Sequence, residues 1–289
     1  MRDGLKEKPS PGIGGKMRNT KTAELVLTAL FAAIIIIMAF TPVGYIPLVV
    51  INATIIHIPV ILGALFCGPK KGGFLGFVFG LTSFIKNTIA PDALLAFVFS
   101  PVVAVRLVGT SGILKSILIC FVPRILVGIL PYYVYLGVKK VLVSEKKTIW
   151  SNVLNVLIGL FLTIGCHAFI NKVFEENPLS NSLAWAISVV VGVVVFAGLE
   201  VLTLKKSGVL SAFIYAGIVG AMTNTILVMG GIFVLYKDAY ALQKGIATSA
   251  VLGSIGGVIS FNGVLEAIVA AILVAAIGET LYKIKPIQK

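Results

Sequence analysis

The chain has 289 residues, of which 58% are hydrophobic and only 12% are charged, and its mean hydropathy is +1.06. A soluble domain carries roughly twice that charged fraction, so the composition excludes an ordinary soluble globular protein. The formal net charge of +13 would suggest nucleic acid as a partner of a soluble chain. Here the basic residues follow a topology pattern instead, and no nucleic-acid partner is expected.

Apolar runs long enough to cross a bilayer recur along the chain. A helix needs about 20 apolar residues to cross a hydrocarbon core about 30 Å thick. The runs are continuous rather than alternating, which favours helices over strands. We therefore predict an all-α polytopic membrane protein. Its eight expected spans cover residues 22–41, 53–68, 72–88, 113–138, 152–170, 183–203, 208–236 and 262–282.

The segments outside these spans differ in character. Residues 1–21 are rich in Gly, Pro and Lys and are predicted to be a disordered cytoplasmic leader. Residues 89–111 and 237–261 are semi-apolar but interrupted by Pro, Gly and Ser, and are predicted to be folded loops or re-entrant segments. The sequence has no GxxxxGK[ST], HExxH or GxSxG motif, and its three cysteines lack metal-ligand spacing. No enzymatic activity, metal or cofactor is therefore expected.

The basic residues predict the orientation of the chain in the membrane. If the N-terminus is cytoplasmic, 17 of the 24 Lys and Arg residues lie on the inner side. Cytoplasmic loops carry an excess of Lys and Arg. We therefore predict a multi-pass protein of the plasma membrane with both termini in the cytoplasm.

In this orientation, polar residues from several spans lie toward the outer half of the bilayer. An ionisable group at membrane depth costs at least ~2.5 kcal/mol, so it usually faces a partner or a water-filled cavity. We predict an outward-facing pocket for a small polar solute, with Tyr45 of the first outer loop as a lid. The other predicted pocket residues are Asn52, His57, Arg124, Asn224, Asn262 and Glu266.

Simpler roles stay open for the individual residues. His57 can be a packing histidine, and Arg124 with Glu266 can be a structural ion pair between two helices. Asn224 can hydrogen-bond a neighbouring helix. Lys86 is expected to extend to the outer interface rather than to join the pocket.

Small residues at four-residue spacing mark faces where helices approach closely. Ala29 and Ala33 lie one turn apart on the first span, and this face can dock another membrane protein. Packing within the chain is the preferred interpretation of the other two series. These are Gly72, Gly76 and Gly80 on the third span and Ala267, Ala271 and Ala275 on the last.

Several of these segments together resemble a known family. The run "NATIIHIPVILGALFCGPKKGGFLGFVFGLTSFI" resembles the second and third helices of the substrate-binding S components of energy-coupling factor (ECF) vitamin transporters. The segments "PRILVGILPYYV", "AGIVGAMTNTILVMGGIFVLY" and "NGVLEAIVAAIL" look like the fourth, fifth and sixth helices of that family. The resemblance implies a six-helix bundle, with residues 22–144 forming helices 1–4 and residues 208–289 forming helices 5–6. Residues 145–207 then look like an inserted pair of transmembrane helices.

The resemblance also implies a function. An S component captures a small vitamin in the outer half of the membrane and then associates with a transmembrane coupling protein and two cytoplasmic ATPases. Ala29 and Ala33 match the face that meets the coupling protein. The "HIPVILGAL" and "TNTILVMGG" segments look most similar to the pantothenate-type branch. Either Arg124 or Lys86 would then pair with a carboxylate of the ligand, and Asn224 and Asn262 would contact its amide or hydroxyl groups. Riboflavin, niacin, pyridoxine-type compounds and cobalamin stay open as alternatives.

Two functions from other classes compete with this hypothesis. One is a self-sufficient ion- or proton-coupled secondary transporter, in which Glu266 and His57 would titrate. The other is an intramembrane enzyme acting on lipid, with His57 or His167 as the base.

Overall fold

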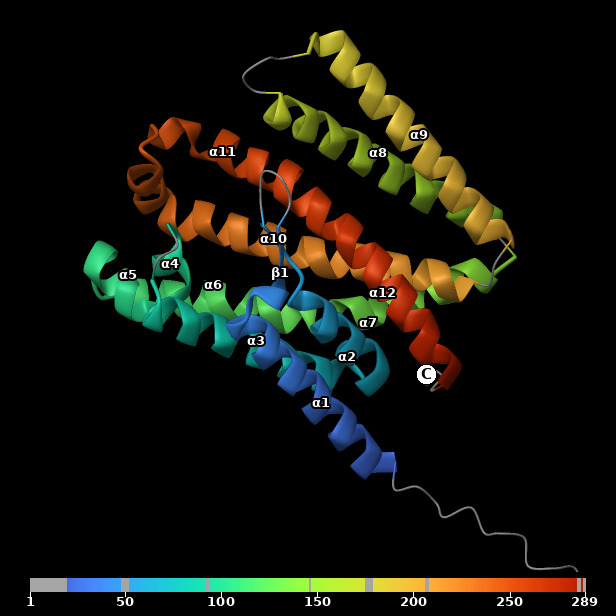
Figure 1. Cartoon of the computed structure of the whole chain (residues 1–289), viewed down its shortest axis with the longest axis horizontal. Helices are drawn as coiled ribbons and strands as arrows, with labels where there is room; N and C mark the ends of the chain where they lie inside the picture. The colour runs from blue at the N-terminus through green and yellow to red at the C-terminus, as the bar shows by residue number, and fades with distance from the viewer. Residues whose placement is uncertain are drawn as a thin grey trace, which may run out of the picture.

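The computed structural model describes residues 20–47, 52–91, 94–145, 147–174, 179–205, 208–284 and 287, and every structural statement below concerns these residues. The chain is almost entirely helical, with one short hairpin of two strands near the N-terminus (Figure 1). The strands are β1 (Tyr45–Pro47) and β2 (Asn52–Thr54), and the short turns are η1 (Pro42–Gly44), η2 (Thr248–Ala250) and the π-helical η3 (Ile259–Gly263). The α-helices are α1 (Thr20–Phe40), α2 (His57–Cys67), α3 (Pro69–Ile89), α4 (Ala96–Phe99), α5 (Pro101–Val108), α6 (Ser111–Val127), α7 (Leu130–Val143), α8 (Lys147–Val173), α9 (Asn181–Lys205), α10 (Gly208–Lys244), α11 (Val251–Val258) and α12 (Val264–Ile284).

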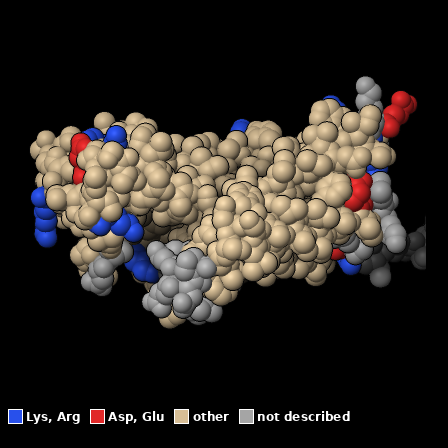
Figure 2. All heavy atoms as spheres, turned by 90° about the horizontal axis from the view of Figure 1, so that it is seen from above, with Lys and Arg blue, Asp and Glu red and all other residues tan. Residues whose placement is uncertain are grey.

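The described part of the chain contains six helices that are long and apolar enough to cross a bilayer. They are Thr22–Phe40, Ser111–Leu142, Lys147–Asn171, Asn181–Val201, Val209–Lys244 and Thr248–Ile284. On the face shown in Figure 2, charged residues gather toward the two ends of the long axis and the band between them is almost uncharged. This distribution matches a multi-pass protein whose long axis crosses the membrane.

The predicted count of eight spans is not confirmed, because the second and third expected spans take another form. At about 1.5 Å per residue the 11 residues of α2 reach only about 16 Å, roughly half of a hydrocarbon core. Gly68 separates α2 from α3 and has φ 88°, a left-handed conformation that favours glycine. Residues 57–89 therefore form a short helix, α2, which a turn at Gly68 joins to the 21-residue helix α3.

The two interrupted stretches fold into short helices. Residues 89–111 contain α4 and α5, and Ser100 caps α5 by accepting a hydrogen bond from the backbone N–H of Val103. Residues 237–261 contain the end of α10 together with η2 and α11. Helix α10 thus runs beyond the expected end at residue 236, and Tyr236, with φ −134°, is the kink inside it.

Glycines on α3 determine how closely this helix approaches α6. A Cβ atom at Gly72 would overlap the carbonyl oxygen of Gly128, and one at Gly76 would overlap the carbonyl oxygen of Arg124. At Gly80 a Cβ would lie 3.1 Å from the carbonyl oxygen of Cys120. The glycine series is therefore used for packing within the chain, as the sequence predicts, and it places the backbone of Arg124 directly against α3.

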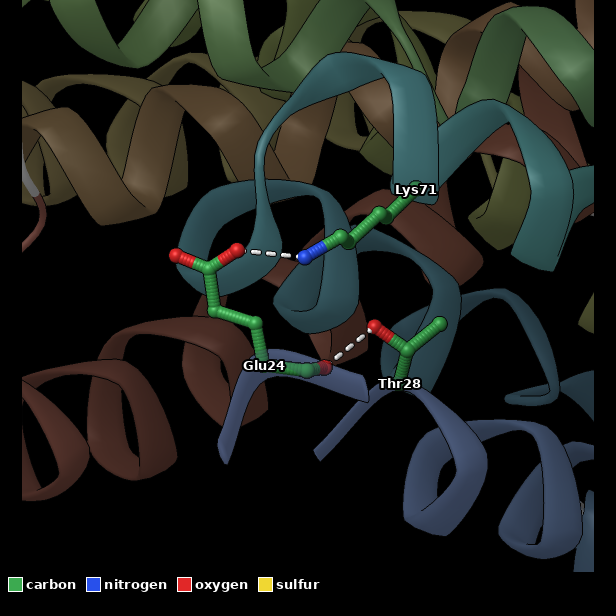
Figure 3. Close-up of polar contacts among 3 residues, drawn as sticks. All are labelled: Glu24, Thr28 and Lys71. Carbon is green, nitrogen blue, oxygen red and sulfur yellow. Dashed lines mark hydrogen bonds and ion pairs between the residues drawn. The ribbon is translucent and has the colours of Figure 1, made fainter. Parts of the chain in front are cut away.

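An ion pair joins the N-terminal ends of α1 and α3. Lys71 of α3 pairs with Glu24 of α1, and Thr28 donates a hydrogen bond of 2.7 Å to the carbonyl oxygen of Glu24 (Figure 3). Both charged side chains are about a third exposed, so the pair contributes at most about 1 kcal/mol. The main effect of the pair is to set the position of α1 along α3.

Helices α8 and α9 form a hairpin on the side of the molecule opposite to α1 (Figure 1). The main core is built from α1, α2, α3, α7, α10 and α12, with Ile35, Leu75, Tyr135, Phe213 and Val274 fully or almost fully buried. Most of α9 is exposed, in contrast. The hairpin is therefore peripheral to the bundle, and the interpretation of residues 145–207 as an insertion stays a prediction.

Candidate solute-binding cavity

A polar cavity of about 280 Å³ lies among α3, α6, α10 and the start of α12. Four of the predicted pocket residues line it together, and they come from three separate parts of the chain. These are Arg124 of α6, Asn224 of α10, Asn262 of η3 and Glu266 of α12. The remaining lining residues are Thr54, Ile56, Phe79, Ser83, Asn87, Phe99, Thr225, Val228, Met229 and Val258.

Arg124 is held at the cavity by a break in its own helix. Pro123 has no backbone N–H, so the carbonyl of Ile119, four residues earlier, receives no helical hydrogen bond from it. The guanidinium Nη1 of Arg124 donates to this carbonyl at 2.9 Å. The guanidinium carbon also lies 4.6 Å from the ring centre of Phe99 and 5.5 Å from that of Phe79. These contacts orient a cation that is only 5% exposed.

Glu266 connects three elements at the edge of the cavity. Its Oε1 accepts a hydrogen bond of 3.1 Å from the backbone N–H of Thr54, the last residue of β2. Its Oε2 accepts one of 3.1 Å from the hydroxyl of Thr225 on α10. Each carboxylate oxygen has a second lone pair, so Glu266 can still accept from a ligand.

The two predicted asparagines, Asn224 and Asn262, add amide groups to the same space. The Oδ1 of Asn224 is buried and accepts no hydrogen bond from any described residue. A buried polar atom without a partner is uncommon and demands an explanation, such as a ligand. Asn262 lies in the π-helical turn η3, four residues before Glu266, so both side chains project from the same face of this segment.

The structure does not bring every predicted residue to the cavity. His57 is 1% exposed, lies at the start of α2 among apolar side chains and does not line the cavity. Neither of its ring nitrogens has a hydrogen-bond partner among the described residues. The backbones of Tyr45 and Asn52 lie in the β1–β2 hairpin, paired with Thr54 and Pro47, but their side chains lie outside the described residues.

Three further predictions concern residues at other places in the molecule. Lys86 donates a hydrogen bond of 3.1 Å to the carbonyl oxygen of Ala39 near the end of α1 and does not line the cavity. Ala29 and Ala33 are both exposed on α1. His167 stacks on the ring of Trp185, with 3.9 Å between ring centres, and is also away from the cavity lining.

Four polar lining residues were missed from the sequence, namely Thr54, Ser83, Asn87 and Thr225. Ser83 and Asn87 are four residues apart on α3, which places them on one helix face, and this spacing could have found them. Thr225 follows Asn224 directly. A threonine in an apolar run costs little by hydropathy, so only the tertiary structure distinguishes Thr225 from an ordinary polar side chain in a helix.

A polar, partly charged cavity lined largely by residues of the candidate membrane spans indicates a multi-pass membrane protein that can hold a polar solute. The family described as "ECF transporter, substrate-specific component" matches residues 23–204 of this chain. Because the match covers more than half of the chain, the protein belongs to this family. It is a family of transporter components rather than of enzymes.

The names of two relatives agree with this assignment. The chain is 34% identical over 189 residues to the pantothenic acid transporter PanT of Lactococcus lactis, which covers 62% of this chain and 85% of the relative. It is 27% identical over 277 residues to the pantothenate transporter PanT of Leuconostoc mesenteroides, which covers 93% of this chain and 96% of the relative.

Proposed function

We propose that this protein is the substrate-capture subunit of an ATP-driven ECF importer and that it binds pantothenate in the cavity around Arg124. The names of the two relatives support the choice of vitamin. The observation that carries the proposal is the chemistry of the cavity, which offers one buried cation, three side-chain amides, a carboxylate and several hydroxyls in a single space.

Pantothenate matches this set of groups. It has one carboxylate, one amide and two hydroxyls. The guanidinium of Arg124 suits the carboxylate, because Arg binds carboxylates through two parallel hydrogen bonds. The Oδ1 of Asn224 and the free lone pairs of Glu266 suit the amide N–H and the hydroxyl groups. The aromatic and aliphatic lining at Phe79, Phe99 and Val228 suits the methyl-bearing part of the vitamin.

The test is a titration of the purified full-length protein with pantothenate, and with riboflavin, niacin and pyridoxine as competitors. We expect Arg124→Ala to weaken pantothenate binding at least about 30-fold, because truncating one partner of a buried charge pair costs about 2–5 kcal/mol. The matched control is Arg106→Ala, which removes an exposed arginine of α5 that does not line this cavity. Full affinity in a folded Arg124→Ala protein, or preference for another vitamin, would overturn the assignment.

The coupling to ATPases is a separate part of the proposal. The exposed Ala29 and Ala33 on α1 form a flat face, flanked by exposed Leu25 and Leu30, that suits a helix of the coupling protein. Ala29→Trp should abolish pantothenate uptake by cells while pantothenate binding is retained. Ala197→Trp, at an exposed alanine of α9, should leave both unchanged. Uptake by the protein alone, driven by an ion gradient without the ATPases, would instead establish a secondary transporter.

A further inference from the structure

A second cavity, of about 420 Å³, lies between the α8–α9 hairpin and helices α10 and α12. Its lining differs fundamentally from that of the Arg124 cavity, because every lining residue is aliphatic or aromatic, a glycine or a cysteine. Representative residues are Leu162 and Cys166 of α8, Val191 of α9, Ile214 of α10, and Ile268 and Ala271 of α12. Such a cavity offers nothing to water or to a polar solute, since apolar cavities stay dry.

Contacts between the hairpin and the bundle close this cavity at both ends. At one end Phe169 of α8 stacks on Phe261 of η3, with 5.3 Å between ring centres. At the other end Asn155 of α8 accepts a hydrogen bond of 2.6 Å from the hydroxyl of Tyr215 on α10. The amide nitrogen of Asn155 in turn donates to Glu200 of α9 at 2.6 Å. The hairpin is thus attached to the bundle at both ends of the cavity. Between these attachments Gly165 of α8 also packs against Val264 of α12, near the Phe169 end.

The cavity is open toward the surroundings of the protein in its middle part. Two of its lining residues, Ile272 and Val191, are 61% and 38% exposed. All four bounding helices belong to candidate membrane spans, so the medium outside this opening is lipid hydrocarbon.

The dimensions of the cavity fit one acyl chain. Along α8 the lining extends from Ile158 to Phe169, which is about 16 Å at 1.5 Å per residue. One leaflet of a bilayer contributes about half of a 30 Å hydrocarbon core, or about 15 Å. A transmembrane helix of a partner does not fit, because it must continue to both membrane surfaces and the two attachments block its path. An acyl chain ends in a methyl group and can enter from the side.

We propose that this cavity is a binding site for an acyl chain of a membrane phospholipid, held between the α8–α9 hairpin and the bundle. The bound chain completes the packing that the hairpin lacks, because a hydrocarbon tail restores the dispersion contacts that an empty cavity loses. The site is separate from the Arg124 cavity and does not depend on which solute that cavity binds.

The test uses a phospholipid with a photoreactive diazirine near the end of one acyl chain, incorporated into nanodiscs with the full-length protein. After irradiation, peptide mass spectrometry locates the labelled residues. We expect labels on the cavity faces of α8 and α12, around Cys166 and Ala271, well above those on the outward face of α9 around Val190 and Val194. Equal labelling of the two faces would mean that lipid only surrounds the protein, and the proposal would be wrong.

A pair of alanine variants on α12 provides a second measurement. Ala271→Phe fills the cavity, whereas Ala276→Phe adds the same bulk at an exposed position outside its lining. Native mass spectrometry in mild detergent counts the phospholipids that stay bound. We expect a severalfold loss of retained lipid in Ala271→Phe and none in Ala276→Phe. Unchanged retention in both variants would overturn the proposal, and if Ala271→Phe does not fold, the labelling of the wild-type protein still decides it.

Discussion

Replacing Gly76 by Ala tests whether the close contact of α3 with α6 positions the cavity. A Cβ at residue 76 would lie 2.8 Å from both the carbonyl carbon of Arg124 and the Cα of Ile125, and it would overlap the carbonyl oxygen of Arg124. Carbon atoms in contact are normally about 3.5–4.0 Å apart, so the helices must separate by roughly 1 Å. Both sides of this contact are backbone, and no side chain can rotate away to relieve it.

The expected loss of stability and affinity follows from this close contact. Overpacking of a well-packed contact typically costs about 1–3 kcal/mol, and we expect Gly76→Ala to lower the free energy of unfolding by this amount. The displaced Arg124 should also bind pantothenate about tenfold more weakly, since 1.4 kcal/mol corresponds to a factor of ten.

The assay is thermal unfolding in detergent, followed by a pantothenate titration of the folded protein at low temperature. Gly137→Ala is the matched control, because Gly137 lies in α7 and a Cβ there would meet no atom within 4 Å. This variant should be unchanged or slightly more stable, since Ala is favoured over Gly in a helix interior by roughly 0.5–1 kcal/mol. Equal melting temperatures and affinities for the two variants would refute the argument that the glycine contact sets the position of Arg124.

Three further substitutions separate the roles of the polar groups. Glu266→Gln should weaken pantothenate binding and speed amide hydrogen exchange at Thr54, because hydrogen bonds to a charged acceptor contribute about 1.5–3 kcal/mol. Unchanged exchange at Thr54 would show that Glu266 does not hold β2. Asn224→Leu should weaken pantothenate binding about tenfold. The ligand-free protein should be equally or more stable, because the substitution removes a buried oxygen that has no hydrogen-bond partner among the described residues. A loss of stability without ligand would contradict this. Tyr215→Phe removes the hydrogen bond to Asn155 and should speed exchange in α8 with a cost of about 1 kcal/mol. Its pantothenate affinity should match the wild type, because Tyr215 does not line the Arg124 cavity.

The position of the α8–α9 hairpin affects which surface of the protein is accessible to a partner protein. The hairpin lies on the side of the bundle opposite to α1, where Ala29 and Ala33 are exposed (Figure 1). The α8–α9 hairpin therefore leaves the proposed docking face uncovered. In the bilayer the hairpin widens the molecule away from that face.

Much of the candidate site could be predicted from the sequence, because polar residues at membrane depth are costly and therefore informative. Arg124, Asn224, Asn262 and Glu266 were identified by this reasoning, and all four line one cavity. The same reasoning did not place His57, since hydropathy gives the depth of a residue but not the surroundings of its helix. Every residue of α2 from His57 to Phe66 is buried, so this helix lies inside the bundle and His57 is buried with its apolar neighbours.

The amino-acid sequence was enough to predict a helical membrane protein, because continuous apolar runs permit little else in a bilayer, where every backbone polar group must be satisfied internally. Which side chains share a cavity could be seen only in three dimensions, because helix rotation and interhelical distance depend on contacts between distant segments. The approach of α3 to α6 at Gly76 and the bridge from Glu266 to Thr54 are both of this kind. They join residues that lie far apart in the chain, and no local pattern encodes them.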